Sequence, residues 1–124
     1  MLRACRKLLR PGGRLAFFTI FVAPGLTAPE YQRALRSGPT FVSSRRRDHA
    51  ALIASAGFGR SEETDLTAEF GSTSRAWQTE RDKHAAEIIT VEGEAAFNER
   101  QSDLGVQSEA IEAGLLRRSL FVCS

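Results

Sequence analysis

The stretch Arg10-Pro-Gly-Gly-Arg-Leu-Ala-Phe-Phe-Thr-Ile-Phe-Val22 decides the fold class of this chain. Its Pro11-Gly12-Gly13 segment predicts a tight reversal, because proline cannot continue a helix and glycine adopts positive φ angles. Leu15 to Val22 is aromatic and β-branched, and apolar almost without alternation. Such a run is typical of a strand that helices cover on both faces. We therefore expect an α/β protein with an interior parallel strand here.

Segments with helical spacing of apolar residues lie on both sides of this strand. The segment 2–9 precedes the reversal, and a short helix is expected around Glu30–Arg36, within a stretch rich in proline and glycine. A clearer helix is expected from near Arg46, where Ser43 or Ser44 can cap it.

The segment that follows is polar. Ala56-Gly57-Phe58 ends the preceding helix and leads into Arg60 to Ala68, which is rich in Ser, Glu, Thr and Asp. An exposed edge strand tolerates such polarity, and charges there discourage association between sheet edges. We expect an edge strand.

The composition turns helical between Ser72 and Ala113. Gly93 and Gly105 each weaken a helix by about 1 kcal/mol relative to alanine, so two helices with a break are expected rather than one rod. Leu116 to Cys123 is expected as a final strand that ends the chain on a buried element.

Charge and length exclude several classes of partner. The 124 residues carry a net charge of +2 and are 42% hydrophobic, as in an ordinary soluble domain. The apolar run 15–23 is too short for the ~20 residues of a membrane span. Aromatic residues are not interleaved with the basic ones, as surfaces that stack nucleic-acid bases require. We expect neither nucleic acid nor a membrane as a partner.

The two cysteines give no metal or disulfide pattern. Cys5 and Cys123 lie near opposite ends of the sequence, without a CxxC pair or a nearby histidine at metal-ligand spacing. We expect free thiols in a reducing compartment and no metal site. No secretory signal pattern is present, so we expect a cytoplasmic protein.

Two motifs resemble the second half of class I S-adenosylmethionine-dependent methyltransferases. Leu2 to Phe17 is similar to the helix, turn and fifth strand of that fold, and Asp48 to Phe58 is similar to the next helix. The resemblance implies a partial Rossmann-like methyltransferase sheet, with one interior parallel strand and a C-terminal antiparallel strand pair. It also implies the division of the single domain: sheet and flanking helices in residues 1–70 and 114–124, helical insertion in 71–113.

The cofactor-binding motifs of that family have no counterpart in this sequence. Gly12-Gly13 precedes a strand instead of joining a strand to a helix, and Gly57-Phe58-Gly59 follows a helix. The resemblance thus implies S-adenosylmethionine for the parent family, but no cofactor-binding residue and no cofactor for this chain alone. Met1 is then an internal start, the start of a truncated product, or the start of one part of a split protein.

Candidate substrate-binding residues follow from the rule that open α/β sheets bind ligands beyond the carboxyl ends of their strands. That rule places Thr19, Phe21 and Tyr31 nearest an acceptor substrate. Trp77 and Arg81, one helical turn apart, are candidates for a lid from the insertion. The favoured alternative makes Trp77 and Tyr31 packing residues and Arg81 a surface charge.

No catalytic residue is assigned from the sequence. His49 and His84 are the candidates for a general base, but solvated or capping roles explain each more simply. Asp65 and Glu69 are candidates for binding a cationic amine, and solvated edge charges explain them as well.

The favoured function is the C-terminal, substrate-side part of a methyltransferase that acts on a small molecule. The alternative is a non-catalytic module, derived from a methyltransferase, that dimerises or binds another protein. The expected partners are an acceptor substrate and either a second copy of the chain or the missing N-terminal half.

Overall fold

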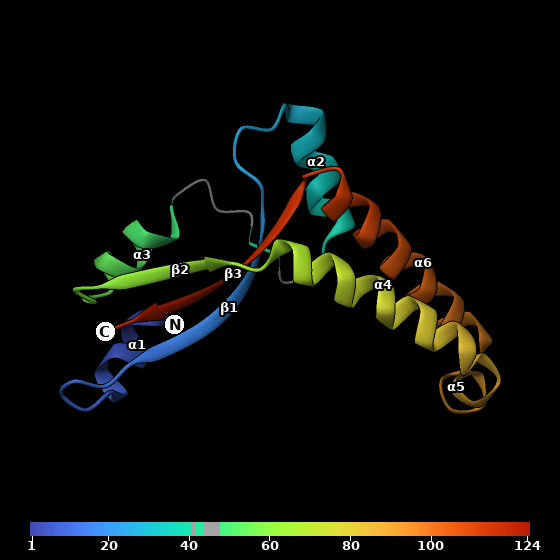
Figure 1. Ribbon diagram of the computed structural model, residues 1–124, viewed down its shortest axis with the longest axis horizontal. Helices are drawn as coiled ribbons and strands as arrows, with labels where there is room; N and C mark the ends of the chain where they lie inside the picture. The colour runs from blue at the N-terminus through green and yellow to red at the C-terminus, as the bar shows by residue number, and fades with distance from the viewer. Residues whose placement is uncertain (41, 44–47) are drawn as a thin grey trace.

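The computed structural model describes residues 1–40, 42–43 and 48–124. Figure 1 shows a small sheet with helices beside it and a helical arm that extends from one end. Its elements in chain order are α1 (Leu2–Leu8), β1 (Leu15–Val22), α2 (Ala28–Ser37), α3 (His49–Ser55), β2 (Ser61–Asp65), α4 (Thr67–Lys83), α5 (Ala85–Glu92), α6 (Glu94–Glu112) and β3 (Leu116–Cys123). The expected α/β class is confirmed.

The sheet has the strand order β1-β3-β2, and β3 runs antiparallel to both neighbours. The expected antiparallel pair of β2 and β3 is present, and β2 is the exposed edge strand. In the described sheet β3 is the central strand, and Leu15–Val22 lies beside it. On its other side, β1 has one parallel bridge, from Phe21 to Ser43.

One face of the sheet is covered by the two short helices α1 and α3. Phe121 and Cys123 of β3 form a buried cluster there with Ile53 of α3 and with Phe58. Leu15 and Phe17 of β1, and Leu2 and Leu9 of the α1 region, pack against this cluster.

The opposite face is covered at one end only. Val22 and Leu116 are buried there against Phe70 of α4 and Ile111 of α6. Toward the other end, Ala16 is exposed and Phe18 is 55% exposed. The register places these two side chains beside Val122 and Leu120 of β3, which are half-buried. We call the part of the sheet formed by Ala16, Phe18, Leu120 and Val122 the open face.

Side-chain caps set the ends of the helices. The Thr27 hydroxyl and the Glu30 carboxylate form a capping box at the start of α2. At α3 the cap is Asp48, whose Oδ1 accepts a hydrogen bond from the Ala50 N–H, and the helix begins at His49. Ser43 lies in the bridge to β1 instead, and Ser44 and Arg46 lie outside the described residues.

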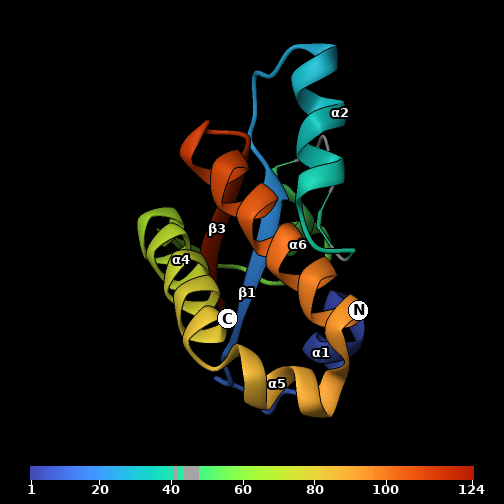
Figure 2. The ribbon, with the colours of Figure 1, turned by 90° about the vertical axis from the view of Figure 1, so that its right-hand side faces the viewer.

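Helices α4, α5 and α6 form the helical arm, residues 67–112. α4 and α6 lie side by side and α5 joins them at the far end (Figures 1 and 2). The break at Gly93 is confirmed, with φ of +90°. The break suggested by Gly105 is wrong, because this glycine lies inside α6, where an added Cβ would meet the Gln78 Nε2 of α4 at 3.2 Å.

None of the described helices is long and apolar enough to cross a membrane.

Candidate functional site

A cavity of about 840 Å³ lies at the C-terminal end of β1. The end of the strand, the following loop, the first turns of α2 and the start of α3 bound it, together with side chains from β2 and β3. Its described lining residues are Phe21, Val22, Ala23, Pro24, Gly25, Leu26, Ala28, Tyr31, Gln32, Asp48, His49, Glu63 and Arg117. Its volume lies within the usual range for sites that bind small molecules.

His49 is fixed in this cavity by aromatic packing. Its ring centroid lies 4.9 Å from that of Phe21 and 5.1 Å from that of Phe121. It also lines a neighbouring hollow of about 590 Å³, so its ring lies between the two. The sequence interpretation of His49 as a solvated or capping residue missed this half-buried position. Asp48, the residue before it, makes the capping contact.

Ionic groups from the two other strands face the same cavity. The Ser119 hydroxyl donates a hydrogen bond to Glu63 Oε1 at 2.7 Å. Arg117 Nη2 lies 2.7 Å from Asp65 Oδ2, just outside the lining. Hydrogen bonds from the Thr67 hydroxyl and from Arg117 lower the pKa of Asp65 from 3.8 to about 2. Asp65 therefore stays ionised and compensates the charge of Arg117.

The structure brings together two of the five substrate-binding residues expected from the sequence. Phe21 and Tyr31 line the cavity, whereas Thr19 lines the neighbouring hollow with Leu52 and Ile53. Trp77 and Arg81 lie on the helical arm, in a separate groove of about 560 Å³ that shares no described lining residue with the cavity.

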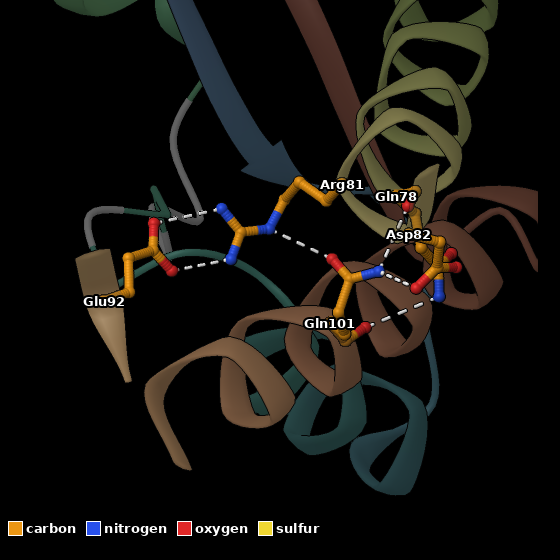
Figure 3. A network of polar contacts seen from close by, with 5 residues as sticks. All are labelled: Gln78, Arg81, Asp82, Glu92 and Gln101. Carbon is orange, nitrogen blue, oxygen red and sulfur yellow. Dashed lines mark hydrogen bonds and ion pairs between the residues drawn. The ribbon is translucent and has the colours of Figure 1, made fainter. Parts of the chain in front are cut away.

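Arg81 is held in a network of polar side chains between the helices of the arm (Figure 3). Its Nη2 lies 2.8 Å from Glu92 Oε2, and its Nε donates to Gln101 Oε1 at 3.0 Å. Gln101 in turn donates to the Gln78 carbonyl and to Asp82 Oδ1. The hydrogen bond with Glu92 raises the pKa of Arg81. These contacts give Arg81 a role in joining the helices.

The other ionisable candidates lie away from the cavity. His84 is exposed at the junction of α4 and α5, where its Nδ1 lies 3.5 Å from Glu87 Oε1. Glu69 is exposed in the first turn of α4. No group of three or more His, Cys, Asp or Glu side chains among residues 1–40, 42–43 and 48–124 could hold a metal ion.

The loops that leave the carboxyl ends of β1 and β2 do not fit an S-adenosylmethionine site. The loop from β1 to α2 has a single glycine, Gly25, and the Thr27–Glu30 capping box already occupies the start of α2. The β2–α4 junction has no glycine, and the Asp65 carboxylate accepts from the Thr67 N–H at its first turn. Neither loop is a glycine-rich turn of the kind that presents its backbone N–H groups to a cofactor.

Comparison with solved structures shows that this architecture is similar in fold to parts of S-adenosylmethionine-dependent methyltransferases and cyclopropane synthases. Phosphoethanolamine N-methyltransferase 2 of Haemonchus contortus, in complex with phosphomonomethylethanolamine and S-adenosylhomocysteine, matches 98% of the chain with a TM-score of 0.78 and 12% identity. The cyclopropane synthase MmaA2 of Mycobacterium tuberculosis matches 98% with a TM-score of 0.75 and 16% identity. The mycolic acid cyclopropane synthase CmaA1, complexed with SAH and CTAB, matches 98% with a TM-score of 0.77 and 17% identity.

These likenesses show that the chain has a methyltransferase-like fold. The chain spans 28% of the length of the Haemonchus contortus structure and 47% of each of the two cyclopropane synthase structures. No protein-family model and no curated protein sequence matches it.

Proposed function

We propose that this chain is the C-terminal, substrate-side part of an S-adenosylmethionine-dependent methyltransferase that acts on a small molecule. The observation that carries the proposal is the match of 98% of the chain to less than half of each compared methyltransferase structure. The cavity at the C-terminal end of β1 supports the substrate-side assignment, because this end of a strand is where α/β folds bind their ligands.

The cofactor contacts come, in this proposal, from a further segment. The strand-to-helix loops of this chain do not fit S-adenosylmethionine, and the open face offers apolar surface against which such a segment can pack. The outer edge of β1, opposite to β3, supports the same arrangement. Among the described residues its one bridge on that side joins Phe21 to Ser43, so the part of the strand that contains Ala16 and Phe18 can pair with a further segment.

Two measurements test this function. Isothermal titration of the 124-residue chain with S-adenosylmethionine is expected to show no binding, and micromolar affinity would contradict the proposed division of the site. Transfer of a radiolabelled methyl group to a small-molecule acceptor is expected only when a cofactor-binding segment is supplied, in the same polypeptide or as a second chain. Absence of transfer in every such assembly would refute the activity.

A dimerising, non-catalytic module is the second candidate function. The specific observation in its favour is the open face, with Phe18 55% exposed, next to the outer edge of β1. Sedimentation velocity distinguishes this candidate: a concentration-independent monomer would exclude it. A dimer that Phe18→Lys dissociates would support it.

A further inference from the structure

We propose that the cavity at the C-terminal end of β1 binds a small organic cation, an alkylammonium group carried by the acceptor substrate. That the cation belongs to the acceptor substrate rests on the proposed function. The binding itself needs neither cofactor nor methyl transfer. It follows from three properties of the lining: its charge, its aromatic rings and its size.

The described ionic groups of the cavity leave an excess of negative charge. Asp48 and Glu63 are the two carboxylates in the lining, and Arg117 is the cation. Asp65 lies 2.7 Å from Arg117 and is held ionised, so the guanidinium charge is already compensated. An anionic ligand would compete with Asp65 for Arg117 and meet the two other carboxylates, whereas a cation is attracted by both.

Each lining carboxylate keeps an oxygen to offer to a ligand. Asp48 accepts a hydrogen bond through Oδ1 from the Ala50 N–H at 3.1 Å, and Glu63 accepts through Oε1 from the Ser119 hydroxyl. An ionised carboxylate has about four lone-pair sites on its two oxygens. These hydrogen bonds therefore orient the two carboxylates and leave acceptor sites on each of them.

Aromatic rings supply the second feature that favours a cation. Phe21, Tyr31 and His49 line the cavity, and the contacts of His49 with Phe21 and Phe121 hold its ring in place. Ring faces attract ammonium groups through their quadrupole, and methylated ammonium groups also pack against them. An aromatic lining with carboxylates therefore selects an organic cation over a neutral apolar molecule, which would desolvate the carboxylates without compensation.

The size of the cavity limits the ligand to a small molecule. A volume of about 840 Å³ holds an alkylammonium headgroup together with the rest of a modest acceptor.

The test is an NMR titration of the full 124-residue chain with choline and with 3,3-dimethylbutan-1-ol. The alcohol has the shape of choline without its charge, and choline stays cationic at every pH. Choline is expected to shift the amide resonances of cavity residues such as Phe21 and Gly25, with an affinity about tenfold or more above that of the alcohol. Inorganic phosphate is expected to leave these resonances unchanged.

Charge-removing variants sharpen the test. Glu63→Gln keeps an acceptor for Ser119, and Asp48→Asn keeps a good N-cap residue, so both are expected to fold. Each should weaken choline binding by about three- to fivefold, the range of a partly exposed ion pair. Glu62→Gln is the matched control: Glu62 is the neighbour of Glu63 in β2, belongs to the opposite face and pairs with Arg60. It is expected to leave choline binding unchanged.

Several outcomes would overturn the inference: no binding of choline, equal binding of choline and the alcohol, displacement by phosphate, or equal loss in E62Q and E63Q. These failures are distinct from failure of the proposed function. Charge-selective choline binding without methyl transfer in any assembly would leave the site standing and refute the methyltransferase. Methyl transfer to oxygen or carbon acceptors, without choline binding, would support the methyltransferase and refute the cation site.

Discussion

The sheet and the helical arm of this molecule are held together by different interactions. In the sheet, Phe121 and Leu116 of β3 are almost fully buried, one on each face. In the arm, beyond the apolar contact of Phe70 and Ile111 next to the sheet, α4 and α6 meet through small and polar side chains. The Ser74 and Ser108 hydroxyls are 2.9 Å apart and buried, and Gly105 lies against Gln78. Phe97 is a buried aromatic residue toward the far end of the arm, with Arg81 over its ring.

This difference explains which parts of the chain show clearly in the sequence. Burial of apolar side chains leaves a periodic pattern, and both long strands could be read from it. A polar interface leaves no such pattern, because Gln, Ser and Arg at a helix contact look like solvated residues until the partner helix is known. The helical composition and the two glycines of this segment predict two helices with a break, whereas the arm consists of the three helices α4, α5 and α6.

The largest effect is expected from Phe121→Ala. Phe121 is 1% exposed and stacks on Phe17 at a centroid distance of 5.4 Å, so its removal leaves a cavity at the centre of the sheet. We expect a loss of about 3–5 kcal/mol in the free energy of unfolding, measured by urea denaturation. Phe18→Ala on the open face is the control, with an expected loss below about 1 kcal/mol. Equal losses would show that the open face is as well packed as the covered one.

The strand order could not be read from the sequence. Leu15–Val22 is apolar on both faces, which predicts an interior strand, but which strands pair depends on residues about a hundred positions apart in the sequence, such as Leu15 and Cys123. The start of α3 is set by the Asp48 side chain, which caps the helix, whereas the sequence offered Ser43 or Ser44 as the cap. The helix ends at Gly57 and Gly93 were predictable, since a positive φ favours glycine locally.

An intermediate effect is expected from Arg81→Ala, which tests whether the arm depends on its polar network. The substitution leaves Glu92 without its bidentate partner and Gln101 without a donor (Figure 3). We expect the thermal midpoint, followed by circular dichroism, to fall by several degrees. Arg75→Ala is the matched control, since Arg75 forms an exposed ion pair with Glu112 across the same two helices. If both substitutions lower the midpoint equally, the network adds nothing beyond an exposed pair.

The candidate site was predictable only in part, for the same reason as the sheet. The rule for carboxyl ends of strands pointed to Phe21 and Tyr31, which come from β1 and the helix after it. Glu63 and Arg117 come from β2 and β3, and their place in the cavity depends on the strand register. Trp77 and Arg81 were grouped with the site because the direction of the arm relative to the sheet cannot be read from local spacing.

The smallest effect is expected at Asp65, where the sheet meets the arm. Its carboxylate accepts from the Thr67 N–H at the start of α4 and from Arg117 of β3, and these contacts lower its pKa to about 2. A pKa below the unfolded value of about 3.8 means that this stabilisation is present above pH 4 and is lost as the pH falls from about 4 to 2.

Asp65→Asn should therefore flatten this part of the pH dependence of the free energy of unfolding, by less than about 1 kcal/mol because the side chain is half exposed. Urea denaturation at pH 2, 3, 4 and 7 measures it, with Glu69→Gln, an exposed carboxyl in the first turn of α4, as the control. Asparagine still accepts the Thr67 N–H through Oδ1, so the substitution removes the charge together with the hydrogen bond from Arg117. An unchanged slope in Asp65→Asn would assign the acid sensitivity to carboxylates elsewhere. The junction would then be held by its hydrogen bonds, as the arm is, and not by its charge.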